Sequence, residues 1–151
     1  MSDHLVQIIP TDRAFVPPPE AQKKAIDLLK TLAPDADEVK IEVSDETRFI
    51  GCGSNWESVF CPFCGTKLEV WFWAELDAVQ KASGLTDLAV ETPCCQDRTT
   101  LDGLRFGWPV GFARFALVAR NTALRKNLGG DQKQTLEAAL GCPVRVILSR
   151  V

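Results

Sequence analysis

The sequence predicts an α+β fold: a ferredoxin-like split β-α-β sheet with a cysteine zinc-binding insertion between its two halves. Two β-α-β patterns predict the sheet, one near each end of the 151-residue chain. With right-handed crossovers, their four strands can interleave into one antiparallel sheet that carries both helices on one face. Residues 46–110 lie between the patterns and hold five of the six cysteines and all four tryptophans. We therefore expect one domain, residues 1–151, with the metal-binding insertion at 46–110.

The first β-α-β unit is predicted from three patterns. Residues 5–9 form a short β-rich run, and a turn-prone stretch with Pro17-Pro18-Pro19 follows it. From Glu20 onward apolar residues recur at the spacing of an amphipathic helix, and Pro34 closes that pattern. Residues 39–43 alternate apolar and polar side chains, which is typical of a strand with one solvated face.

The remaining elements follow from the same kinds of signal. Residues 48–50 predict a short strand, and residues 68–83 predict a helix that Gly84 caps. Apolar side chains cover more than one face of this helix, so we expect it to be buried against two surfaces. The second unit comprises a strand at 114–120, a helix at 131–140 that ends at Gly141, and a strand at 144–148. We identify no internal repeat in the sequence.

Charge and hydropathy narrow the class of protein. The net charge of −3 argues against sequence-independent nucleic-acid binding, which depends on many phosphate contacts. No stretch approaches the roughly 18 apolar residues of a membrane span, and the first residues lack the pattern of a secretory signal. We therefore expect a cytoplasmic protein that does not contact membranes.

The cysteines predict a metal site. In the cytoplasm thiols stay reduced, so close cysteine clusters favour metal over disulfides. Cys61-Pro62-Phe63-Cys64-Gly65 has the spacing of a zinc knuckle, and Cys94-Cys95 follows about 30 residues later. We predict that Cys61, Cys64, Cys94 and Cys95 bind one structural Zn²⁺. Because adjacent ligands need a bent backbone, Cys52 is an alternative ligand, whereas Cys142 is expected in the core.

These ligands favour a non-enzymatic role. Four thiolates leave no open coordination position for water, and His4 is the only histidine available for acid–base chemistry. We therefore favour a module that binds another protein or regulates it, with an immunity-type protein as one form. The chain also has a surplus of aromatic residues. Among them Trp108, which Pro109 follows, is our candidate for an exposed anchor.

Two alternatives remain open. Cys61 and Cys64 also match the active-site motif of glutaredoxins, which would make the chain a thiol–disulfide redox protein. A basic face with interspersed aromatic residues would instead suit single-stranded nucleic acid. Its candidate residues are Arg98, Arg105, Arg114, Arg120, Arg125 and Lys126.

Four short motifs follow one another along the chain: Cys61-Pro62-Phe63-Cys64-Gly65, Thr92-Pro93-Cys94-Cys95, Leu101-Asp102-Gly103-Leu104 and Gly111-Phe112-Ala113-Arg114-Phe115. In this order the chain resembles a family of small bacterial proteins that carry CPxCG, PCC and GFARF motifs and have no settled activity. The resemblance spans about residues 49–148. It departs at Gln96, where glycine is common, and at Cys52, where an acidic or amide residue is usual. The resemblance implies the cysteine site but no function.

Overall fold

A four-stranded antiparallel sheet forms one half of the molecule. The computed structural model describes residues 2–124 and 128–151. The sheet has the order β2-β7-β1-β8, and its strands are β1 (His4–Pro10), β2 (Glu38–Ile50), β7 (Gly111–Arg120) and β8 (Val144–Arg150). Each neighbouring pair is antiparallel. The predicted α+β class with a four-stranded antiparallel sheet is confirmed.

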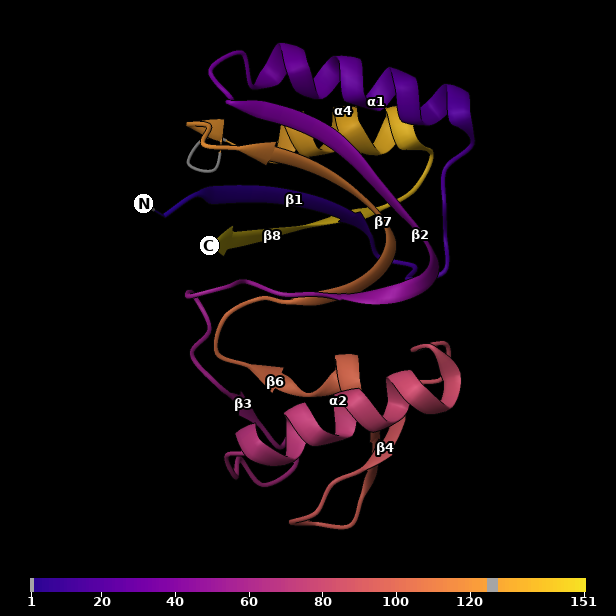
Figure 1. The fold of residues 1–151 in the computed structure, drawn as a ribbon, viewed down its shortest axis with the longest axis vertical. Helices are drawn as coiled ribbons and strands as arrows, with labels where there is room; N and C mark the ends of the chain where they lie inside the picture. Colours follow the sequence, from indigo (N-terminus) through magenta and orange to yellow (C-terminus); the bar gives the residue numbers. More distant parts are fainter. Residues whose placement is uncertain (1, 125–127) are drawn as a thin grey trace.

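Two helices cover one face of this sheet (Figure 1). They are α1 (Pro19–Leu32), which begins with proline at a position where no N–H is needed, and α4 (Gly130–Leu140). Alternate strand residues point toward the helices and form a buried core with them. This core includes Val6, Ile8, Leu29, Phe115, Leu117, Leu136 and Leu140.

The elements between β2 and β7 form a second layer, which we call the cysteine-rich half (Figure 1). They are β3 (Val59–Phe60), α2 (Glu69–Ser83), β4 (Ala89–Glu91), β5 (Arg98–Thr100), the short 3₁₀ helix η1 (Leu101–Gly103) and β6 (Arg105–Phe106). Strand β3 pairs with β6, and β4 pairs with β5. No helix within the described ranges is long and apolar enough to cross a membrane.

Strand β2 joins the two halves and is longer than predicted. The segments 39–43 and 48–50, predicted as separate strands, belong to the same strand, interrupted by a bulge. Five residue steps along β2, from Val43 to Arg48, face only two along β7, from Phe115 to Ala113. This bulge lets both strands bend away from the helix-covered sheet toward the cysteine-rich half. Because the residues of the bulge, Ser44 to Thr47, are all polar, the sequence did not indicate that the strand continues through them.

Helix α2 packs on an aromatic cluster. Its buried residues, Phe72, Leu76 and Val79, form a single stripe, so the expectation of two buried surfaces was wrong. Phe72 is fully buried, and the centroid of its ring lies within 5.9 Å of the ring centroids of four other residues, Phe49, Trp56, Trp73 and Phe106. Because Phe49 belongs to β2, this cluster connects α2 to the sheet.

The chain on either side of the cysteine-rich half lies along the outer edge of β8. The N–H of Arg150 donates to the carbonyl of Cys52 at 3.2 Å, and the carbonyl of Arg150 accepts the N–H of Ser54 at 2.8 Å. The indole N–H of Trp108 donates to the carbonyl of Leu148 at 3.0 Å. A side chain at Gly53 would collide with the Arg150 carbonyl, 2.1 Å from an added Cβ, so only glycine fits there.

Candidate metal centre

The first pair of predicted ligands lies on a tight turn after β3. The N–H of Cys61 donates to the carbonyl of Thr66 at 2.8 Å, and the N–H of Gly65 donates to the carbonyl of Cys61 at 3.0 Å. Gly65 has φ +78°, a conformation that glycine adopts without strain. The turn thereby brings Cys61 and Cys64 to one side of the loop, as a zinc knuckle requires.

The second pair lies on a turn with the same hydrogen bonds, between β4 and β5. The N–H of Thr92 donates to the carbonyl of Asp97 at 2.9 Å, and the N–H of Gln96 donates to the carbonyl of Thr92 at 2.8 Å. Gln96 has φ +57° and corresponds to Gly65. Thr92, which is buried, therefore occupies the position that Cys61 has in the first turn.

This correspondence is an internal repeat that the sequence prediction missed. Residues 59–66 match residues 90–97 in turn structure at a constant offset, so Cys95 corresponds to Cys64 and Cys94 to Phe63. The shared Val-x-[Cys/Thr]-Pro-x-Cys pattern was the available signal. In this turn the adjacent cysteines Cys94 and Cys95 precede the left-handed residue Gln96, as Cys64 precedes Gly65 in the first turn.

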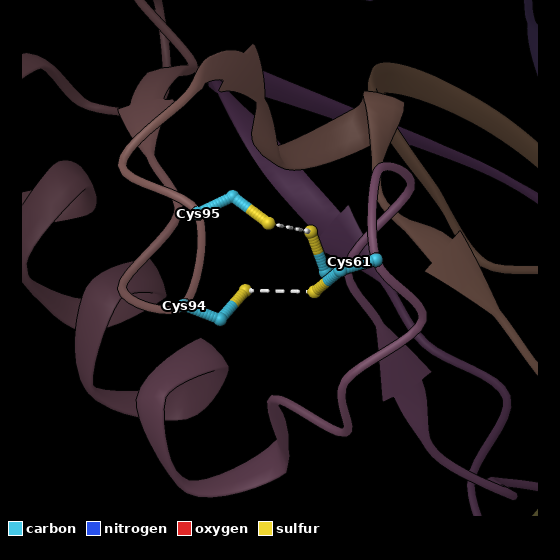
Figure 2. A group of neighbouring side chains, drawn as sticks. Cys61, Cys94 and Cys95 are labelled. Carbon is cyan, nitrogen blue, oxygen red and sulfur yellow. Dashed lines mark hydrogen bonds between the residues drawn. The ribbon is translucent and has the colours of Figure 1, made fainter.

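The two turns bring the four predicted cysteines together. All four Sγ atoms lie within 4.8 Å of one another. Cys61 and Cys95 are 4.0 Å apart between sulfurs, and Cys64 and Cys94 are 3.4 Å apart. Figure 2 shows the sulfurs of Cys94 and Cys95 directed from their loop toward the loop of Cys61. Zn–S bonds of about 2.3 Å in a tetrahedron separate sulfurs by about 3.8 Å, so this cluster is compatible with one zinc ion.

The local groups favour thiolate on the first turn. A hydrogen bond with the Thr66 hydroxyl, 3.0 Å away, lowers the pKa of Cys64 to about 6. Burial opposes ionisation of Cys61, but the N–H groups of Cys64 and Phe63 point at its sulfur and lower its pKa. Amide groups directed at sulfur stabilise its anionic form, which is the form that binds metal.

The groups around the second turn favour the protonated thiol there. A hydrogen bond with Cys64 raises the pKa of Cys95, and desolvation by the neighbouring groups raises the pKa of Cys94. A metal ion that binds all four sulfurs must displace these protons, so metal affinity should fall at low pH.

The other two cysteines and the histidine lie outside this cluster. Cys52 is buried beside β8, and burial raises the pKa of its thiol. Cys142 packs against the core between the sheet and its helices, as predicted. His4 lies in β1. Within the described ranges the only group of side chains able to hold a metal is Cys61, Cys64, Cys94 and Cys95.

A hollow lies beside the cysteine cluster. It has a volume of about 560 Å³ and is lined by Thr66, Lys67, Leu68, Glu69, Val70, Trp71, Pro93 and Cys94. Val70, in the first turn of α2, is 86 % exposed, and Phe63, at the tip of the first turn, is 52 % exposed. Large apolar side chains are thus open to solvent next to the candidate metal centre.

The other predicted binding residues are dispersed. Trp108 is half-buried, and with Pro109 it lines a hollow of about 370 Å³ against β8. Arg98 begins β5 in the cysteine-rich half, whereas Arg120 ends β7 in the four-stranded sheet, 3.4 Å from the carboxylate of Asp3. Arg125 and Lys126 lie outside the described residues.

Comparisons with known protein families, with curated proteins and with solved structures gave no match. The cluster of four sulfurs is therefore the feature that bears most directly on function.

Proposed function

We propose that this chain is a non-enzymatic zinc-binding protein. A ferredoxin-like domain carries an insertion whose shape depends on a structural four-cysteine zinc site, and the chain acts by binding another protein. The observation that carries this proposal is the cluster of four cysteine sulfurs within 4.8 Å, two from each of two matching turns. The strand order β2-β7-β1-β8, with both helices on one face, supports the ferredoxin-like arrangement.

Cys61, Cys64, Cys94 and Cys95 would hold the ion. With four thiolates bound, no position is left for water, so the site suits stabilisation and not hydrolysis. In small zinc modules such an ion contributes on the order of 10 kcal/mol of folding free energy. The strands of this half are only two or three residues long, so an ion that joins its two turns would add to the stability that the aromatic cluster supplies.

A protein partner suits the surface next to the metal. Val70 is an exposed apolar side chain that lines the hollow, Trp73 is 42 % exposed on the same helix, and Phe63 is exposed in the first cysteine turn. Exposed aromatic and apolar groups around a hollow are typical of protein interfaces. We propose that the partner inserts an apolar side chain there, in a regulatory role of which immunity-type inhibition is one form.

Metal analysis tests the first part of this proposal. We expect about one zinc per chain, by elemental analysis of protein purified without added metal. Cys61→Ser should lose the zinc, whereas Cys52→Ser should retain it because Cys52 lies outside the cluster. Wild-type protein that contains no zinc, or equal zinc in both variants, would refute the site.

Partner binding is tested separately. A stoichiometric complex isolated from the source cells should form with wild-type protein and should be lost with Val70→Glu. Val43→Glu is the matched control, because Val43 is also an exposed valine, 52 % accessible, but belongs to β2. Equal loss of the complex in both variants would exclude the surface beside the metal.

One observation favours a second candidate function. The lowered pKa of Cys64 and its exposure are typical of a reactive thiol. A glutaredoxin-like protein would form a reversible Cys61–Cys64 disulfide and would contain no metal, so the metal analysis separates the two candidates.

A further inference from the structure

Within the proposed zinc centre, we infer that Cys64 and Cys94 form an oxidation-sensitive pair. A hydroperoxide converts these two cysteines into a disulfide that joins the two turns and releases the metal. This inference rests on the proposed function and assigns a mode of regulation to the same site. It differs from the glutaredoxin-like alternative, in which Cys61 and Cys64 of one turn pair with each other.

Exposure distinguishes the four cysteines. Cys61 has no accessible surface, and Cys95 is half-buried. Cys64 and Cys94 are both exposed, and Cys94 also lines the hollow next to the site. A dissolved peroxide therefore reaches Cys64 and Cys94 before the other two ligands.

The distances favour the same pair. The sulfurs of Cys64 and Cys94 are 3.4 Å apart, compared with 4.0 Å for Cys61 and Cys95. A disulfide bond is about 2.05 Å long, so the first pair needs the smaller movement. The sulfur of Cys61 also accepts the N–H of Phe63, 3.4 Å away, which holds it inside its own turn.

The chemistry balances with one hydroperoxide. The thiolate of Cys64 attacks the peroxide, the O–O bond breaks, and Cys64 becomes a sulfenic acid while hydroxide or an alkoxide leaves. The thiolate of Cys94 then attacks the sulfur of Cys64, the S–S bond forms, and hydroxide leaves. The peroxide gains two electrons, and the two thiolates lose them. Only Cys61 and Cys95 then remain as metal ligands, too few for a closed zinc site.

The new bond replaces the ion as a cross-link. Because Cys64 and Cys94 come from different turns, their disulfide joins the same two turns that the metal joins. The cysteine-rich half should therefore keep its two turns together after the metal has left. A Cys61–Cys64 bond, within one turn, could not have this effect.

Peptide mapping tests the inference on the full-length, zinc-loaded protein. Trypsin places Cys61 and Cys64 in the peptide 49–67, and Cys94 and Cys95 in the peptide 82–98. After treatment with limiting hydrogen peroxide, we expect a disulfide link between these two peptides under non-reducing conditions. The amount of zinc released should be proportional to the amount of this disulfide. Cleavage after Phe63 separates Cys61 from Cys64 and assigns the bond, and Cys94→Ser should abolish it. Reduction followed by added zinc should restore the original metal content.

Different results refute different statements. A Cys61–Cys64 bond, a Cys61–Cys95 bond formed first, or oxidation of Cys64 without any link would overturn the inference while leaving the zinc site intact. Absence of zinc before oxidation would overturn the proposed function. The peptide map of the oxidised protein would still show which cysteines pair, so the two failures are distinguishable.

Discussion

Replacing Gly84 by alanine should show how helix α2 is fixed against the sheet. Gly84 follows α2 with φ +61°, and its N–H donates to the carbonyl of Gln80 at 2.9 Å. An alanine in this left-handed conformation costs about 1 kcal/mol. A Cβ there would also lie 3.1 Å from the carboxyl carbon of Glu46, in the bulge of β2. Moving Glu46 to a poorer rotamer adds about 0.5–1.5 kcal/mol, so we expect a total loss of about 1.5–2.5 kcal/mol.

Two other glycines serve as matched controls. Gly141 ends α4 with φ +78° and has no neighbour within 4 Å of an added Cβ, so Gly141→Ala should lose only about 1 kcal/mol. Gly130 has neither a positive φ nor a close neighbour, so Gly130→Ala should stabilise the protein by about 0.4–1 kcal/mol. The difference between Gly84→Ala and Gly141→Ala isolates the contact with Glu46.

Urea unfolding measures these differences, and thermal unfolding provides a second measurement, with about 2–4 °C expected per kcal/mol. Glu46→Ala combined with Gly84→Ala should reduce the loss to that of Gly141→Ala, because the double variant lacks the steric contact. If Gly84→Ala unfolds at the same urea concentration as Gly130→Ala, both the left-handed turn and the packing of α2 on the β2 bulge are wrong.

Two further predictions concern stability. Phe72→Ala should lower the free energy of unfolding by about 3–5 kcal/mol in urea titrations, because Phe72 is fully buried among other rings. Trp73 is partly exposed, so Trp73→Ala should lower the free energy of unfolding by less. Equal losses in the two variants would contradict the described cluster. The Thr122 hydroxyl, 2.6 Å from Asp35, holds the pKa of that carboxyl below its ordinary value of 3.8. A carboxyl pKa that is lowered by folding adds stability above pH 3.8, and this stability is lost as the pH falls through the folded-state pKa. Thr122→Val should therefore be less stable than the wild type near neutral pH and should lose less stability on acidification. Parallel pH profiles of the two proteins would count against this bond.

Much of the fold could be predicted because its signals are local. The alternating residues 39–43 predicted a strand, and Gly84 and Gly141 predicted helix ends at which both adopt left-handed conformations. The spacing of Cys61 and Cys64 predicted a turn with both sulfurs on one side. In each case the signal lies within a few residues of the feature it predicts.

The missed features depend on contacts between distant residues. Strand β2 continues through its polar bulge because β7 pairs with both sides of it. Helix α2 leaves Val70 in solvent although its sequence is apolar on several faces, because the available partners cover one face only. The similarity of the Thr92 turn to the Cys61 turn lies mainly in backbone hydrogen bonds, and the sequence shows it only as the short pattern Val-x-[Cys/Thr]-Pro-x-Cys, in which a threonine replaces a cysteine.

The contacts along β8 have a consequence for attempts to shorten the chain. A strand at the edge of a sheet presents unpaired backbone groups, which invite pairing with another molecule and aggregation. Here the Cys52 carbonyl, the Ser54 N–H and the Trp108 indole occupy those groups at Leu148 and Arg150. All three residues belong to the chain entering or leaving the cysteine-rich half. A variant in which a short loop replaces this half would therefore uncover a self-associating edge, so the sheet and the cysteine-rich half are not separable modules.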